Sequence, residues 1–135
     1  MKTADKFTAL RTKMTQIGAD FYLVPSSDAH NSEYLPAAWE RREWMSGFTG
    51  SAGEFMLGHD KGHVWTDGRY VLQAAVELDA NLTETHIVAQ RRFAPVDWLL
   101  EHGHRKVAAL DPKTISIRNA HELQSAMTSI DGKCV

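Results

Sequence analysis

The sequence predicts an α/β fold in which helices pack on a mixed β-sheet. Apolar residues change along the chain between helical spacing and short continuous runs, which is typical of helices and strands in succession. Two short strands, Glu54–Leu57 and His63–Thr66, are separated by a glycine-bounded link and predict a hairpin. The hairpin would supply the antiparallel part of the sheet, and 135 residues are enough for one hydrophobic core.

The first helix is predicted over Ala4–Ile17, because apolar residues recur there at spacings of three, four and three. The residues of this apolar face are Phe7, Leu10, Met14 and Ile17. Thr3 or Asp5 would cap the start of the helix, and Gly18 would end it in the left-handed conformation.

A buried strand is predicted over Ala19–Pro25, since an apolar run there ends at a proline. The polar loop Ser26–Asn31 would leave the carboxyl end of this strand. A helical turn is expected within Leu35–Met45, with Pro36 at its start.

The remaining elements follow the hairpin in alternation. They are a helical pattern over Arg69–Leu78, a strand at Thr83–Val88, a helix at Pro95–Glu101, a strand at Lys106–Leu110, a helix at Ile117–Met127 and a strand from Lys133 onward. Because the last strand stops at Val135, we expect residues 1–135 to be one domain truncated at this strand.

Composition excludes several classes of protein. The net charge is −2 with both signs interspersed, so neither a nucleic-acid face nor a membrane-binding patch is expected. The apolar run Phe21–Pro25 is far too short to span a bilayer. A single cysteine, Cys134, rules out an internal disulfide and favours a reducing compartment, so a cytoplasmic location is expected.

Most of the seven histidines predict no metal site. His59 and His63 have the four-residue spacing of paired ligands on a helix, but a glycine-containing turn lies between them, which favours solvent-facing histidines. His102 and His104 are expected on the surface at a helix end. His30 follows Asp28 after a buried strand, and it remains a candidate for binding beside the simpler reading of a local histidine–aspartate pair.

Nucleophilic catalysis and phosphate binding are not expected. Ser51 resembles the serine of a GxSxG elbow only loosely, and a strand follows it where a helix is needed. Cys134 is close to the end of the sequence, and no catalytic partner that would lower its pKa is recognised. The spacing of Gly47, Gly50 and Gly53 differs from that of both common phosphate loops.

The glycine-rich run Ser46–Gln73 points to Arg69 as the residue of interest. Glycines concentrate where a backbone must turn sharply or approach another closely. The run closes on Thr-Asp-Gly-Arg, which would project Arg69 from the junction between a strand and a helix. Its guanidinium could bind a carboxylate or carbonyl of a ligand, or it could form a structural ion pair with Asp67.

Three motifs in order, SDAHNSEYL, RREWMSGFTGSAGEFML and HVWTDGRYVLQA, fall in the first two-thirds of the chain. They resemble the N-terminal, creatinase-type domain of Xaa-Pro aminopeptidases (aminopeptidase P), and most closely that of the cytosolic type. The resemblance implies a mixed sheet covered by helices, of the ribonuclease H-like kind. It also implies that Arg69 reaches the bound peptide, that His30 lines the same site, and that Arg41-Arg42 is a paired-arginine position of unassigned chemistry.

In this family a separate C-terminal domain holds two divalent metals, usually manganese, and cleaves the peptide bond before proline. The resemblance therefore implies that residues 1–135 contain no metal ligand and no catalytic residue. It implies a part in binding proline-containing peptides and in subunit contacts within a homo-oligomer such as a dimer. A creatinase-type domain of a related prolidase or creatinase is an alternative.

Two further hypotheses come from other classes of protein. Arg69 and the loop Ser26–Asn31 could form a peptide or anion site in a stand-alone binding module. A weaker alternative is an autonomous hydrolase that uses Ser51.

Overall fold

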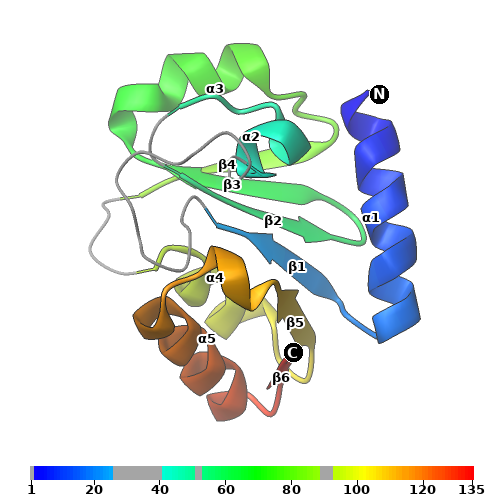
Figure 1. Ribbon diagram of the computed structural model, residues 1–135. Helices are drawn as coiled ribbons and strands as arrows, with labels where there is room; N and C mark the ends of the chain where they lie inside the picture. Colours follow the sequence, from blue (N-terminus) through cyan, green and yellow to red (C-terminus); the bar gives the residue numbers. More distant parts are fainter. Residues whose placement is uncertain (1, 26–40, 51–52, 89–92) are drawn as a thin grey trace.

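The computed structural model describes residues 2–25, 41–50, 53–88 and 93–135, and these segments form a sheet with helices on both faces (Figure 1). The strands are β1 (Phe21–Val24), β2 (Glu54–Gly58), β3 (Gly62–Thr66), β4 (Thr83–Ile87), β5 (Val107–Leu110) and β6 (Lys133–Cys134). The helices are α1 (Thr3–Ile17), α2 (Arg41–Ser46), α3 (Val71–Glu77), α4 (Pro95–His102) and α5 (Ile117–Ser129), with the short 3-10 turns η2 (Gly68–Tyr70) and η3 (Pro112–Thr114).

The sheet is mixed, as the sequence predicts. Its strand order is β4-β3-β2-β1-β5-β6. Strand β2 runs antiparallel to both β1 and β3, whereas the pairs β1–β5, β5–β6 and β3–β4 are parallel. The predicted hairpin is confirmed as β2 and β3, and it supplies the antiparallel part of the sheet.

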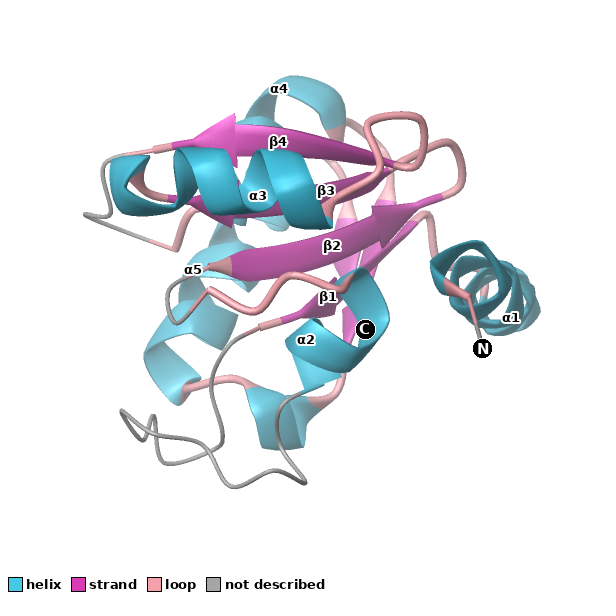
Figure 2. Ribbon diagram, turned by 90° about the horizontal axis from the view of Figure 1, so that it is seen from above, coloured by secondary structure: helices cyan, strands magenta, loops and turns pink. Residues whose placement is uncertain are grey.

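Helices α1, α2 and α3 cover one face of the sheet, and α4 and α5 cover the other (Figures 1 and 2). Each face has its own apolar core because successive strand residues point to opposite sides. In β1, for example, Leu23 packs against the α4–α5 side and Val24 against the α1–α3 side. Each fully buried side chain of this size contributes roughly 1.5–3 kcal/mol.

The predicted apolar face of α1 is confirmed in part. Phe7 and Met14 are fully buried, and Leu10 packs against them at the edge of the core. The prediction is wrong for Ile17, which is 58% exposed. Ala19 takes the core position instead, because the chain turns at the helix end and directs that residue inward.

The two ends of α1 differ in how well the sequence predicts them. Gly18 has φ of 72° and ends the helix in the left-handed conformation, as expected. The predicted N-cap is wrong, because Thr3 is already helical and Lys2 precedes it without a side-chain cap.

The pattern over Arg69–Leu78 forms two elements, η2 and α3, instead of one helix. Ala74 is the buried residue of α3, whereas Leu72 and Val76 are exposed. The apolar pattern therefore predicts the helix correctly but does not predict which of its faces is buried.

The later predicted elements are confirmed as β4, α4, β5, α5 and β6, with ends that differ by no more than two residues. The helical turn predicted in Leu35–Met45 corresponds to α2 from Arg41 onward, and residues 35–40 lie outside the described part. No helix in the described segments has the length and apolar character needed to cross a membrane.

Candidate functional site

Two arginine–aspartate pairs, Arg69–Asp67 and Arg41–Asp111, lie at the end of the sheet where β1, β3 and β5 finish, here called the carboxyl edge. The strand register brings these ends together: Val24 lies opposite Phe55, and Leu23 lies beside Leu110. Strand β2 begins at the same edge, because it runs antiparallel to both neighbours. In open α/β sheets, ligands bind outside the carboxyl ends of the strands.

The turn after β3 fixes Arg69. The Asp67 side chain caps η2 by accepting a hydrogen bond of 3.0 Å from the Arg69 backbone N–H. The same carboxylate accepts from the Arg69 guanidinium, at 3.0 Å from Nε and 2.7 Å from Nη2. The hydrogen bond from the Arg69 side chain lowers the pKa of Asp67. Asp67 therefore stays ionised and binds the guanidinium through its Nε and Nη2 atoms.

The Arg69 side chain is held but open to solvent. It is 69% exposed, although Asp67 beneath it is largely covered. The guanidinium carbon lies 5.2 Å from the centre of the Tyr70 ring, and Tyr70 in turn packs edge-on against Phe48. No described residue accepts a hydrogen bond from Arg69 Nη1. The structural ion pair is thus confirmed, and it leaves the outer side of Arg69 facing solvent.

The buried side chain of Arg42 stabilises the glycine-rich loop. It is only 8% exposed, and its Nη2 donates a hydrogen bond of 2.5 Å to the Gly50 carbonyl oxygen. Its guanidinium carbon also lies 5.3 Å from the centre of the buried Phe48 ring. The arginine position to which the sequence assigned no chemistry is therefore a scaffold for the loop.

Two glycines make room for this arrangement. A Cβ on Gly50 would lie 2.4 Å from the Phe48 ring, and one on Gly53 would lie 2.9 Å from both Arg42 Nη1 and the Trp65 carbonyl oxygen. The glycines thus permit close approach of side chains and backbone, as the sequence predicts.

A second set of hydrogen bonds ties the loop to α3. Thr49 donates to Glu77 from its backbone N–H at 3.0 Å and from its hydroxyl at 2.5 Å, and Gln73 donates to the Thr49 hydroxyl at 2.8 Å. Burial acts to raise the pKa of Glu77, but these hydrogen bonds outweigh it and lower the pKa. The loop, the arginine turn and α3 therefore hold one another in place.

Replacing Gly53 by alanine should destabilise the domain by about 1–3 kcal/mol, because neither the Trp65 backbone nor the buried Arg42 can move aside cheaply. Urea unfolding followed by circular dichroism would measure the change. Gly68→Ala is the matched control, because a Cβ there meets nothing within 4 Å, and it should have little effect. Equal stabilities of the two variants would contradict the packing role of Gly53.

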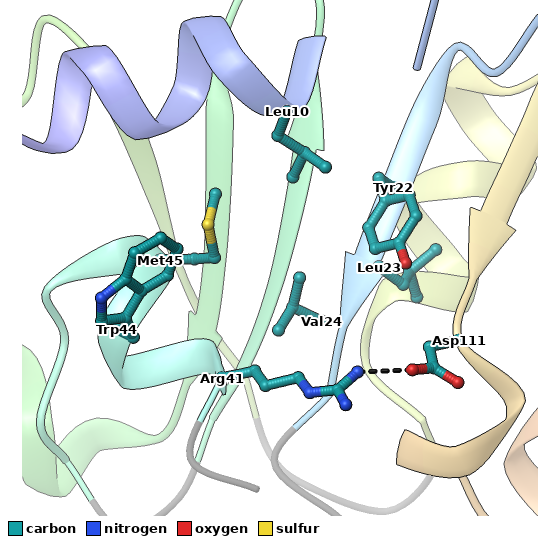
Figure 3. Close-up of a pocket in the computed structure, with 8 residues that line it drawn as sticks. All are labelled: Leu10, Tyr22, Leu23, Val24, Arg41, Trp44, Met45 and Asp111. Carbon is teal, nitrogen blue, oxygen red and sulfur yellow. Dashed lines mark hydrogen bonds and ion pairs between the residues drawn. The ribbon is translucent and has the colours of Figure 1, made fainter. Parts of the chain in front are cut away.

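A pocket of about 230 Å³ opens beside this edge, between α1, β1 and α2 (Figure 3). Its lining is mainly apolar and includes Leu10, Tyr22, Val24, Trp44 and Met45. Arg41 and Asp111 form an ion pair across it. The Lys113 backbone N–H and the Arg41 side chain lower the pKa of Asp111. The pocket is therefore lined by apolar side chains and one ion pair.

The histidine predictions need one correction. His59, His102 and His104 are exposed, as predicted. His63 was expected to face solvent beside His59, but it is 5% exposed. It points to the face of the sheet that α4 covers, where the Trp98 ring centre lies 4.5 Å away. A spacing of four residues could not show this, because the covering helix comes much later in the chain.

Three other predictions have different outcomes. His30 and Ser51 lie outside the described residues, so their predicted roles stay predictions. Cys134 is half-buried in β6, and burial raises the pKa of its thiol, which agrees with an unreactive cysteine.

The fold and the carboxyl edge define an α/β domain that presents one fixed arginine beside a glycine-rich loop. Residues 6–134 match the family model of the creatinase/prolidase N-terminal domain. The chain belongs to this family, and the predicted resemblance to the N-terminal domain of Xaa-Pro aminopeptidases is confirmed.

Relatives in sequence are much longer than this chain. A protein from Arthroderma otae described as probable Xaa-Pro aminopeptidase P is 37% identical over 134 residues, which cover 98% of this chain and 22% of the relative. A protein of the same description from Pyricularia oryzae is 38% identical over 136 residues, with the same coverage. The chain spans about a fifth of the length of these curated relatives.

Solved structures share the fold. X-prolyl aminopeptidase from Caenorhabditis elegans, described as a cytosolic enzyme with a di-nuclear active site, superposes with a TM-score of 0.86 at 29% identity. The match covers all of this chain and 24% of that one. The N-terminal domain of cytoplasmic peptidase PepQ from Mycobacterium tuberculosis has a TM-score of 0.71 at 22% identity, covering 98% of this chain and 90% of that domain.

Proposed function

We propose that residues 1–135 are the non-catalytic N-terminal domain of a metal-dependent Xaa-Pro aminopeptidase, which releases the residue that precedes proline. The observation that carries the proposal is the fixed guanidinium of Arg69, which Asp67 holds from one side while the other side faces solvent. The family membership and the greater length of the relatives support it.

In this proposal Arg69 binds a carbonyl or carboxylate of the peptide. Asp67 removes the conformational freedom that the arginine would otherwise lose on binding, so the guanidinium is positioned before the peptide arrives. The glycine-rich loop and Arg42 keep the turn rigid. His30 is proposed as a second contact to the same peptide.

The catalytic metals belong to the remainder of the longer protein. Asp67 and Asp111 are carboxylates of the carboxyl edge in the described segments. Each is paired with an arginine, so the two do not form a two-metal site. Two divalent cations, proposed to be manganese, would supply the water that attacks the peptide bond.

Assembly and location complete the proposal. Leu72 and Val76 are exposed apolar side chains on α3, which supports a contact with another part of the enzyme or with a second subunit of a homo-oligomer. The cytosolic description of the Caenorhabditis elegans enzyme supports a cytoplasmic location.

The purified 135-residue chain should release no N-terminal residue from a Xaa-Pro tripeptide in the presence of manganese, whereas a longer protein that includes the catalytic domain should do so. Liquid chromatography of the products would measure both. Turnover by the short chain in proportion to its concentration would contradict the proposal.

A binding measurement on the same chain tests the alternative that it is a stand-alone binding module. Calorimetric titration of residues 1–135 with a proline-containing tripeptide should show no appreciable affinity, because half of the site is missing. Tight binding that is lost in Arg69→Ala would favour the binding module instead.

A further inference from the structure

A cluster of potential ligands lies away from the arginine turn, on the face of β3 and β4 that α4 covers. Strand pairing places His63 beside Glu84 and Trp65 beside His86. His63 Nδ1 and His86 Nε2 share a hydrogen bond of 3.1 Å, and His63 Nδ1 lies 3.7 Å from Glu84 Oε2. One ligand atom from each of the three residues lies within 4.8 Å of the others.

We propose that His63, Glu84 and His86 form a binding site for a zinc-class divalent cation. Two imidazole nitrogens and one carboxylate oxygen are a ligand set that zinc uses, with a fourth position left to water. The proposal departs from the expectation that this chain contains no metal ligand, and it is independent of the proposed peptidase function.

Two of the three ligand-atom separations are close to those around a tetrahedral ion. Bond lengths of about 2.0–2.2 Å to nitrogen and oxygen place neighbouring ligand atoms roughly 3.3–3.5 Å apart in a tetrahedron. The observed separations of 3.1 Å and 3.7 Å lie on either side of this range. The two imidazole nitrogens are therefore close to the required separation. All three ligand atoms lie within 4.8 Å of one another, and the exposed Glu84 side chain would move to complete the set.

The two imidazoles need one change of tautomer before both facing nitrogens can bind a metal. Burial, together with the neighbouring His86, lowers the pKa of His63 to about 4. Burial also lowers the pKa of His86. The lowered pKa values disfavour the imidazolium form of both rings. One of the two facing nitrogens carries the proton of their hydrogen bond, and that proton would move to the other nitrogen of its ring when the metal binds.

Aromatic rings fix the orientation of the imidazoles. The His86 ring stacks on Trp65 with ring centres 4.9 Å apart, and the His63 and His86 rings lie nearly parallel and side by side, with centres 5.3 Å apart. Solvent reaches the cluster from β4, the edge strand, where the Glu84 side chain is 58% exposed. A preformed pair of rings with an open side provides both a rigid site and an entry route.

A simple hydrogen bond between two neutral histidines is the competing explanation, and zinc titration separates the two. We expect chelator-stripped chain to bind one Zn²⁺ with a dissociation constant of about 10 µM or lower, measured by calorimetry. His86→Ala and Glu84→Gln should each weaken binding about tenfold or more. Circular dichroism would show that these variants, both on the edge strand, remain folded.

Two control variants test where the ion binds. His104→Ala, which changes an exposed histidine outside the cluster, and Cys134→Ser should leave the zinc affinity unchanged. Absence of zinc binding by the folded chain would overturn the proposal. It would equally be overturned by an unchanged affinity in folded His86→Ala, or by loss of binding in Cys134→Ser.

Discussion

In the longer aminopeptidase that we propose, replacing Arg69 by alanine is expected to lower kcat/KM for proline-containing peptides on the order of tenfold to a hundredfold. The guanidinium is the charged donor that the arginine turn presents to solvent, and alanine removes it completely. The metal content and the unfolding transition should not change, because the Arg69–Asp67 pair lies on the surface. Initial-rate kinetics and metal analysis of the purified variant would check both expectations.

Two further variants, Arg69→Lys and Arg118→Ala, serve as comparisons in this experiment. Lysine keeps the charge but loses the planar two-point contact with Asp67, so it should recover only part of the activity. Arg118 is an exposed arginine of α5, and its replacement should leave the kinetics unchanged. Unchanged kinetics in Arg69→Ala would remove the role proposed for this side chain.

Replacing Arg42 by alanine should lower the free energy of unfolding by about 2–4 kcal/mol. The variant loses the hydrogen bond to Gly50, leaves that carbonyl group without its donor, and opens a cavity against Phe48. Urea unfolding would measure the loss as a lower midpoint with an unchanged slope.

The neighbouring arginine provides the matched control. Arg41 is partly exposed and pairs with Asp111 at the pocket, so Arg41→Ala should cost less than about 1 kcal/mol. Arg42→Met would keep most of the side-chain volume and should fall between the two. Equal losses for Arg41→Ala and Arg42→Ala would contradict the scaffold role of Arg42.

Elements encoded by local sequence were predictable. The spacing of Phe7 and Met14 identified α1, and Gly18 identified its end, because both signals lie within a few residues of the feature they predict. The hairpin β2–β3 and the later alternation of strands and helices were predictable for the same reason. The sequence also directed attention to Arg69, since the turn that positions it is a single short motif.

Features that depend on distant packing were not predictable. His63 and His86 are 23 residues apart and meet only through the register of two parallel strands. Leu72 continued an apolar pattern, but the position of α3 on the sheet directs it outward. The bond between Arg42 and Gly50 joins residues eight positions apart. Its one signal in the sequence was an arginine shortly before a glycine-rich loop.

The most direct test of the central claim is the affinity of the longer enzyme for a peptide that it cannot cleave. A proline-containing tripeptide with a reduced scissile bond separates binding from metal chemistry, and calorimetry would give its dissociation constant for the wild type and for Arg69→Ala. We predict binding at least about tenfold weaker in the variant. Equal dissociation constants would show that Arg69 does not bind the peptide and would contradict the account.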